Sequence, residues 1–489
     1  MKSVYRSILL SAIDRYGSLL FFVVSTAILA RLLTPAEFGI YAVANALTTI
    51  VSTSFQEFGG SNYLLQKPSL SEQSIRTAFT VIFGISAVFT ATIFLLRGEV
   101  ASFFSQDGLQ TALAVSCFNF LLSPFSLTIA ALLRRDLSFG ALTRSNLVGS
   151  FTTAATSIGL AARGYSFMAP VIGIIAGNIA TTTSLLLTRG DMRIFRPSLS
   201  GFRDVLHFGA YSSAGALINV VYNLSPSLIL ARVLDFTSVG IYSRAVSMTQ
   251  VFDRLILQVT TPVVGPAIFA HARAGGDLRR PFLRTIELIT ALQWPFLAFL
   301  ALLAGPIILV WLGPSWTDVA PLIRLLCIAS MALFSATLIY PTLVAVGRIK
   351  DGLLASVISL PPSLLVVFIA SFHGVNAVAA STLLTFPFQA AVANYLVARQ
   401  IGLKPWDFAR ALWKSAAVTI CSTVAAAGGM ALAEAGHCTA PVVVGISAAL
   451  CAVAWIASLL VSRHPLLEHT KSLTNALRPA SRAAHNPLT

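Results

Sequence analysis

The chain is poor in charged residues, which make up only 10% of its 489 positions, whereas hydrophobic residues make up 56%. Soluble globular proteins usually carry about 25% charged residues. So little charge cannot cover a surface that faces water, so we expect most of the surface to face lipid. The mean hydropathy of +0.81 agrees with this interpretation.

Residues and motifs that carry chemistry are also scarce. The five cysteines lie mostly within apolar runs, without close pairs or metal-ligand spacing, and are interpreted as small buried hydrophobic residues. The sequence contains no Walker loop, no nucleophile elbow and no HExxH motif. We therefore expect neither an enzyme nor a protein with a metal or cofactor. The net charge of +15 does not indicate nucleic-acid binding, because lysine and arginine gather in particular loops between apolar runs.

Apolar runs of about 20 residues, the length that crosses a bilayer as a helix, recur along the whole chain. We predict an all-α integral membrane protein with fourteen transmembrane helices. They lie near 12–33, 38–60, 78–96, 110–133, 146–163, 167–188, 207–231, 239–268, 284–311, 319–346, 352–372, 375–397, 411–433 and 440–462. The first run continues to Leu33 without a small-residue cleavage site, so we expect it to be retained rather than removed as a signal peptide.

The basic residues predict the orientation of these helices. With the N-terminus in the cytoplasm, 26 of the 33 lysines and arginines fall on the inner side. The outer side holds Arg31, Arg97, Arg163 and Arg232. Cytoplasmic loops carry such an excess of positive charge, so the sequence predicts an even number of spans with both termini inside.

An internal repeat relates the two halves of the chain. Residues 28–41 read ILARLLTPAEFGIY and residues 229–242 read ILARVLDFTSVGIY, with eight of fourteen positions identical at a constant offset of 201. Both copies join two helices on the outer side, which predicts a parallel repeat about an axis along the membrane normal. We expect one six-helix bundle over 1–195, a second over 196–400, two additional helices over 401–462 and a disordered cytoplasmic tail over 463–489.

Polar side chains follow several predicted helices at helical spacing, which indicates a face toward water, substrate or another polar helix. The clearest such stripe comprises Ser243, Ser247, Gln250, Arg254, Gln258 and Thr261; others comprise Asn45, Thr49, Ser52 and Gln56, and Ser116, Asn119, Ser123 and Ser126. The candidate substrate-binding residues are Arg254, Gln250, Arg15, Asn219, Asn223, Gln56, Gln258, Arg244 and Arg324.

Other interpretations of these polar positions stay open. Serine, threonine and glycine also join membrane helices without any role in transport. Arg15, beside Asp14, could instead reach the inner headgroups. Arg254 lies near the middle of a long predicted span, where a charge costs at least about 2.5–3.5 kcal/mol, so we expect it to face a cavity. A cavity lined by arginine suits an anionic cargo, because guanidinium groups bind phosphate oxygens in a fixed geometry.

The first copy of the repeat, with the segment that follows it, resembles the polysaccharide-transport flippases (Wzx-type) of the MOP superfamily. The resemblance is carried by Arg31, Leu33, Thr34-Pro35, Glu37, Phe38 and Gly39, then Gly60, Leu65 and Gln66. It implies two V-arranged six-helix bundles in a bacterial inner membrane. It also implies flipping of a polyprenyl-pyrophosphate-linked oligosaccharide to the periplasmic leaflet, in partnership with a polymerase and a chain-length regulator.

Two further interpretations belong to other carriers of the same superfamily, a lipid II-type flippase and a cation-coupled multidrug antiporter. The drug antiporters usually have twelve spans and carboxylates in one bundle, whereas acids are scarce in the spans predicted here. A membrane enzyme such as a repeat-unit polymerase needs a large periplasmic loop, and the predicted outer loops are short.

Overall fold

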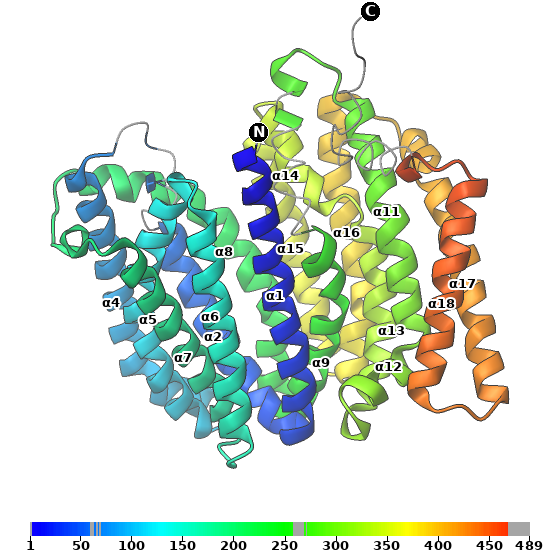
Figure 1. The fold of residues 1–489 in the computed structure, drawn as a ribbon, viewed down its shortest axis with the longest axis horizontal. Coiled ribbons are helices and arrows are strands. Elements are labelled where there is room, and N and C mark those ends of the chain that lie inside the picture. Colours follow the sequence, from blue (N-terminus) through cyan, green and yellow to red (C-terminus); the bar gives the residue numbers. More distant parts are fainter. Residues whose placement is uncertain are drawn as a thin grey trace, which may run out of the picture.

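A computed structural model of the chain describes residues 2–58, 63–64, 67, 70–257, 268–269 and 271–467 (Figure 1). Within these residues the regular secondary structure is helical. The helices are α1 (Lys2–Leu32), α2 (Pro35–Phe58), α4 (Glu72–Phe103), α5 (Gly108–Arg135), α6 (Phe139–Ala161), α7 (Met168–Arg189), η1 (Met192–Phe195), α8 (Phe202–Val233), α9 (Phe236–Thr249), η2 (Asp253–Leu257), α11 (Arg279–Leu302), α12 (Ala304–Trp311), η3 (Pro314–Trp316), α13 (Val319–Ser330), η4 (Met331–Leu333), α14 (Ala336–Ala345), α15 (Ile349–Ser371), α16 (Val375–Ile401), α17 (Pro405–Ala435) and α18 (Ala440–Val461).

Ten helical segments of the described chain are long and apolar enough to cross a membrane, so the expectation of an all-helical, multi-pass membrane protein is confirmed. They lie in α1, α4, α5, α7, α11, α13 with α14, α15, α16, α17 and α18. The tight turns near 163–167 and 372–375, where the sequence predicts two helix boundaries, do separate α6 from α7 and α15 from α16. The tail predicted to be disordered lies mostly outside the described residues.

Three of the predicted spans are broken in the structure. The run 284–311 forms α11 and α12, and Pro306 stands in the first turn of α12, where its missing N–H leaves no helical bond unmade. The run 319–346 forms α13, the short 3-10 helix η4, and α14. In the described part of the run 239–268, α9 ends at Thr249 and the π-helix η2 follows.

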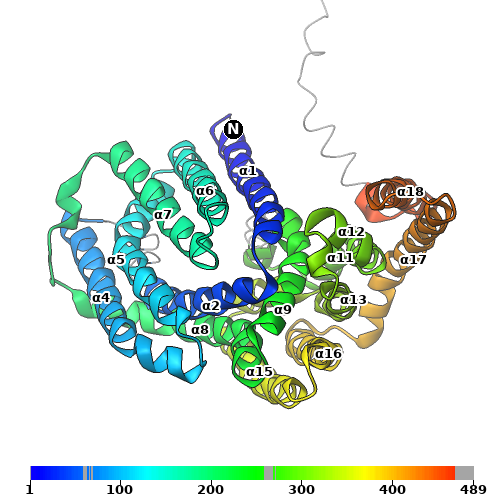
Figure 2. The same cartoon turned by 90° about the horizontal axis from the view of Figure 1, so that it is seen from below.

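Within each half, the order in which the helices pack differs from their order along the chain. Along the first half α1 contacts α6, α6 contacts α7, α7 contacts α5, and α5 contacts α4 (Figure 2). In the second half α15 contacts α8 and α16, and α13 contacts α9, α11 and α16. The helix α2 joins the halves, because it packs along both α8 and α9. The last two helices pair with each other, and α17 lies against α11.

The two copies of the repeat meet at the end of the molecule where α1 turns into α2, called here the α1–α2 end (bottom of Figure 1). A Cβ atom built on Gly39 would overlap the carbonyl oxygen of Phe236, and one built on Gly240 would overlap the carbonyl oxygen of Pro35. Positions 39 and 240, like 35 and 236, differ by the repeat offset of 201. The contact is therefore reciprocal, as an axis between the two copies requires.

Matching helix starts hold this contact in place. In the first copy Thr34 caps α2: its backbone N–H donates to Glu37 Oε2 at 2.8 Å, and the N–H of Glu37 donates to Thr34 Oγ1 at 3.3 Å. In the second copy Asp235 caps α9, accepting from the N–H of Ser238 at 2.7 Å. Caps at equivalent positions start the two helices in the same register.

The largest apolar cluster of the described chain surrounds the same end and draws residues from both halves. Trp316 is fully buried there, and its indole N–H donates to the carbonyl of Ala30 at 2.6 Å. Arg31 donates to the carbonyl of Val310 at 3.0 Å. The two halves are thus packed tightly together at the α1–α2 end.

Candidate functional site

A cavity of about 690 Å³, called here the arginine chamber, lies between α1, α6, α7 and η2. Its volume falls within the range of roughly 300–1,000 Å³ usual for ligand pockets. Its walls are mostly polar and include two arginines from distant parts of the chain. The lining residues are Asp14, Arg15, Ser18, Leu19, Phe22, Asn146, Gly149, Ser150, Thr153, Gly177, Asn178, Thr181 and Arg254.

Arg254 reaches this chamber from η2 and is half-buried. Its guanidinium carbon lies 4.1 Å from the centroid of the Phe22 ring, which supports the planar cation without neutralising it. Within the described part of the chain, the guanidinium forms no hydrogen bond and no ion pair. Its donors are therefore available to an anion that enters the chamber.

Arg15 lines the same chamber from α1. It lies 17 residues from the end of α1 at Leu32, and Arg254 lies 18 residues from the start of α9 at Phe236. At 1.5 Å per residue both lie roughly 25 Å from the α1–α2 end. The two arginines therefore share one depth, close to the far boundary of a hydrocarbon core about 30 Å thick rather than at its centre.

The wall between α1 and α6 is built from paired polar side chains. The Asn146 amide donates to Asp14 Oδ2 at 2.8 Å, and the Ser150 hydroxyl donates to Ser18 at 3.0 Å. Asn146, Ser150 and Thr153 recur at helical spacing, a sequence signal that would have placed α6 at the site. The structure adds these residues and Asp14 to those predicted from the sequence.

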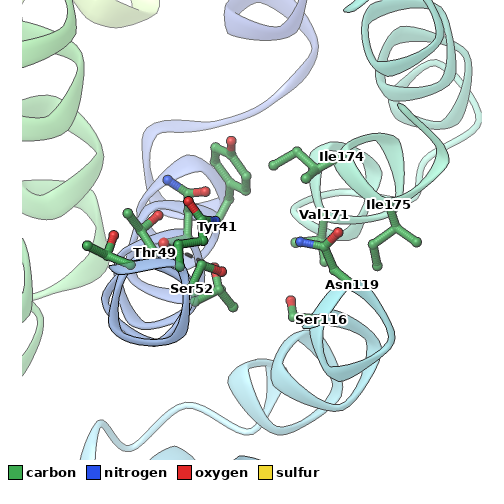
Figure 3. A pocket seen from close by; sticks show the side chains of 13 residues that line it. Tyr41, Thr49, Ser52, Ser116, Asn119, Val171, Ile174 and Ile175 are labelled. Carbon is green, nitrogen blue, oxygen red and sulfur yellow. Dashed lines mark hydrogen bonds between the residues drawn. The ribbon is translucent and has the colours of Figure 1, made fainter. Parts of the chain in front are cut away.

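A second cavity, of about 290 Å³ and called here the neutral pocket, lies between α2, α5 and α7 (Figure 3). It brings together the predicted stripes of α2 and α5, and it includes Gln56 from the predicted site. The lining residues are Tyr41, Ala44, Asn45, Thr48, Thr49, Ser52, Thr53, Gln56, Ser116, Asn119, Val171, Ile174 and Ile175.

The helix α7 separates the two cavities. Its residues Val171, Ile174 and Ile175 line the neutral pocket, whereas Asn178 lines the arginine chamber. The Asn178 amide donates to Asn119 Oδ1 at 2.6 Å, so one hydrogen bond joins a lining residue of each cavity. The two cavities are neighbours that meet at this asparagine pair.

The other predicted site residues line neither the arginine chamber nor the neutral pocket. Gln250, at the C-terminal end of α9, is exposed, and so are Asn219, Asn223 and Arg324. Gln258 and Thr261 lie outside the described residues. Of the nine predicted residues, the structure therefore brings Arg15 and Arg254 into the arginine chamber and Gln56 into the neutral pocket.

Arg244 is buried rather than placed in a cavity, with 3% of its surface exposed. Its guanidinium carbon lies 3.3 Å from the centroid of the Phe38 ring and 5.8 Å from that of Trp316. These aromatic neighbours belong to the apolar cluster at the α1–α2 end. In this conformation Arg244 therefore joins the packing between the halves through cation–π contacts.

A multi-pass helical membrane protein whose halves enclose a polar chamber matches the fold of MOP-superfamily carriers. The fold is similar to that of the lipid II flippase MurJ in an inward closed conformation, with a TM-score of 0.76 and 12% identity over 93% of this chain and 99% of that one. It is also similar to an inward-facing MATE family transporter of the MOP superfamily, with a TM-score of 0.64 and 14% identity over 80% and 98% of the two chains. At such identities the likeness concerns the fold alone.

The chain belongs to the polysaccharide biosynthesis protein family, whose profile matches residues 28–321. It is 23% identical to the lipopolysaccharide biosynthesis protein WzxC of Escherichia coli (strain K12) over 318 residues, 63% of this chain and 63% of that protein. It is 22% identical to the succinoglycan biosynthesis transport protein ExoT of Rhizobium meliloti (strain 1021), over 71% and 70% of the two chains. The resemblance to Wzx-type flippases is thereby confirmed for the family, and so is the expectation of a carrier rather than an enzyme.

Proposed function

We propose that this chain is a flippase that moves a polyprenyl-pyrophosphate-linked oligosaccharide from the cytoplasmic to the periplasmic leaflet by alternating access. The observation that carries the proposal is the guanidinium of Arg254, which faces the chamber without a carboxylate or carbonyl partner in the described chain. The neighbouring Asp253 carries the opposite charge but, within the described residues, does not bond to this guanidinium. A half-buried guanidinium whose donors form no hydrogen bond is costly in a membrane, so it favours a site whose ligand brings negatively charged acceptors.

The depth of the chamber supports this substrate. With both termini in the cytoplasm, as the basic residues predict, Arg15 and Arg254 lie near the cytoplasmic boundary of the membrane. A pyrophosphate that joins a lipid tail to a sugar lies at that boundary before it is flipped. The guanidinium groups would bind its oxygens while the tail stays among the acyl chains.

The closed α1–α2 end supports alternating access. We propose that the full chain has fourteen spans, as two six-helix bundles with two additional helices, and that rocking of the bundles opens and closes the contact between Gly39 and Gly240. The close packing there fits a conformation shut on the periplasmic side. Release to that side would require the two glycines to separate.

The proposal is tested by analysing lipid-linked intermediates in cells that carry Arg254→Ala. We expect this variant to accumulate polyprenyl-linked repeat units on the inner leaflet and to lose roughly 100-fold or more of polymer yield, because a hydrogen-bonded charge pair is worth about 3–5 kcal/mol. The matched control is Arg163→Ala, at an exposed arginine in the turn between α6 and α7. Normal polymer yield from Arg254→Ala protein in the membrane would remove this residue from the site.

The same experiment separates the two other carriers considered. Accumulated peptidoglycan precursor would favour a lipid II-type flippase. Lost drug resistance with a normal glycan would favour a multidrug antiporter. The chamber does not favour the antiporter, because its lining contains two arginines and one carboxylate, and that carboxylate already accepts from Asn146. A lipid II-type flippase would bind the same pyrophosphate, so the chamber fits that substrate equally well. We also propose a polymerase and a chain-length regulator as partners, because the resemblance to Wzx-type flippases implies them.

A further inference from the structure

We propose that the neutral pocket is a separate compartment of the substrate site and holds one uncharged sugar ring that carries an apolar substituent. This inference rests on the proposed function, because it assumes a lipid-linked oligosaccharide as the substrate. It assigns a different part of the substrate to each cavity. The arginine chamber binds the pyrophosphate, and the neutral pocket between α2, α5 and α7 selects the sugar.

One wall of the pocket is a row of hydrogen-bonding groups on α2 without partners. In the described part of the chain, the hydroxyls of Thr49 and Ser52 and the amides of Asn45 and Gln56 bond to no other group. Hydroxyls in membrane helices usually bond to the carbonyl one turn back, as Ser54 on the same helix does at 2.8 Å. Unpaired polar groups are costly at membrane depth, so this row calls for water or for a hydroxyl-rich ligand.

The opposite side of the pocket combines an apolar face on α7 with the polar Ser116 and Asn119 of α5. Val171, Ile174 and Ile175 of α7 lie across the cavity from Thr49 and Ser52 (Figure 3). A pyranose ring fits between the polar side chains of α2 and the aliphatic side chains of α7, because its hydroxyls lie on its edges and its C–H groups form apolar faces. A methyl group, as in an acetamido or a 6-deoxy substituent, would bury against the aliphatic side chains.

Charge and size narrow the choice of sugar. The residues that line the pocket include no charged side chain. A uronic acid would bring a carboxylate without a partner, and burying such a group is unfavourable. The volume of about 290 Å³ lies at the lower end of the usual range of ligand pockets, which suits a single ring rather than a whole oligosaccharide.

The position of the pocket connects it with the arginine chamber. Along α7, residues 171–175 of the pocket and 177–181 of the chamber are centred about six residues apart, roughly 9 Å. The hydrogen bond between Asn119 and Asn178 marks the boundary. A pyrophosphate and the sugar bonded to it could therefore occupy the two compartments together.

The test measures binding of three probes to the purified full-length protein in lipid nanodiscs. The probes are a short-chain polyprenyl pyrophosphate, the same molecule with one N-acetylhexosamine, and the same molecule with one hexuronic acid. We expect the N-acetylhexosamine probe to bind about 10-fold more tightly than the bare pyrophosphate, as one or two net hydrogen bonds with some apolar burial would give. The hexuronic acid probe should bind no more tightly than the bare pyrophosphate.

Variants assign the sugar preference to the pocket. The isosteric pair Thr49→Val with Ser52→Ala, and separately Ile174→Trp, should reduce the preference to about twofold or less while the bare pyrophosphate still binds. Retained binding of that probe shows that each variant is folded. Arg254→Ala should weaken all three probes alike, and the control Thr152→Val, at a half-buried threonine of α6 that lines neither cavity, should change none of them.

The outcomes separate this inference from the proposed function. A wild-type protein without a sugar preference, or a preference that survives both pocket variants, overturns the sugar compartment. Binding of the bare pyrophosphate that depends on Arg254 would then still support the flippase. A folded wild-type protein that binds none of the probes overturns the flippase and, with it, the compartment.

Discussion

Replacing Gly39 by alanine should shift the protein away from the conformation that is closed at the α1–α2 end. A Cβ atom at this position would overlap the carbonyl oxygen of Phe236, which belongs to backbone and cannot rotate away. The helices α2 and α9 must therefore move apart for the variant to keep this conformation. Overpacking of such a contact costs about 1–3 kcal/mol.

The cost falls only on the state in which the two helices touch. If the two bundles alternate between states, 1–3 kcal/mol changes the ratio of the populations by about 5- to 150-fold in favour of the separated state. Because the contact is reciprocal, Gly240→Ala should produce a shift of similar size through the carbonyl oxygen of Pro35. This symmetry is a second, independent expectation from the same geometry.

The shift can be measured by labelling a cysteine placed at Val43, a fully buried residue one turn from Gly39 on the same face of α2. The native cysteines are replaced first, and spheroplasts are treated with a membrane-impermeant maleimide. We expect slow labelling in the otherwise unchanged protein and labelling several-fold faster with Gly39→Ala. The control is Gly84→Ala, because a Cβ atom at Gly84 meets nothing within 4 Å. Equal labelling rates in the Gly39→Ala and Gly84→Ala proteins would refute the reasoning.

Two stability measurements test other contacts, both by thermal unfolding in detergent. Trp316→Phe removes the indole that donates to the carbonyl of Ala30 in a fully buried site, and should lower the free energy of unfolding by about 1–3 kcal/mol; an unchanged unfolding temperature would contradict that bond. Burial, reinforced by the positive charge of Lys414, lowers the pKa of His464 from its usual 6.5 to about 4. Between these values the unfolded chain binds a proton that the folded chain does not, so stability should fall as the pH drops from about 6.5 to 4, and His464→Gln should lessen the fall; identical pH profiles for both proteins would argue against it.

Much of the fold follows from the sequence, because the backbone polar groups of a chain in lipid must be hydrogen-bonded within the protein. Apolar runs of about 20 residues must form helices in a bilayer, and the described parts of the predicted runs are helical apart from short breaks such as those at Leu303 and at Phe334 and Ser335. The duplicated segment around Gly39 and Gly240 also predicted which helices correspond. Glycine at both positions is explained by the contact itself, in which each backbone leaves no room for a side chain on the other.

The site could be predicted only in part, because helical spacing shows that a helix has a polar face but not what that face meets. The stripes containing Thr49 and Asn119 do line one pocket together, as their spacing indicated. In the described part of the stripe along 239–268, Gln250 is exposed whereas Arg254 lines the chamber, so these two residues do not share one environment. The helix α9 ends at Thr249, just before Gln250, which is the counterpart of Thr49 in the repeat. The π-helix η2 that follows brings Arg254 to the chamber.

The sequence alone determined that this chain is a duplicated helical membrane protein with excess positive charge, because hydrophobic length, charge and repeat offset are properties of the chain itself. Only the tertiary structure decided that Arg254 meets Arg15 in a chamber while Arg244 packs against Phe38. In the sequence, Arg15, Arg244 and Arg254 are all arginines within or near predicted transmembrane helices, and their local pattern does not show what each of them contacts. Their different surroundings come from helices far away in the sequence, whose packing no local pattern records.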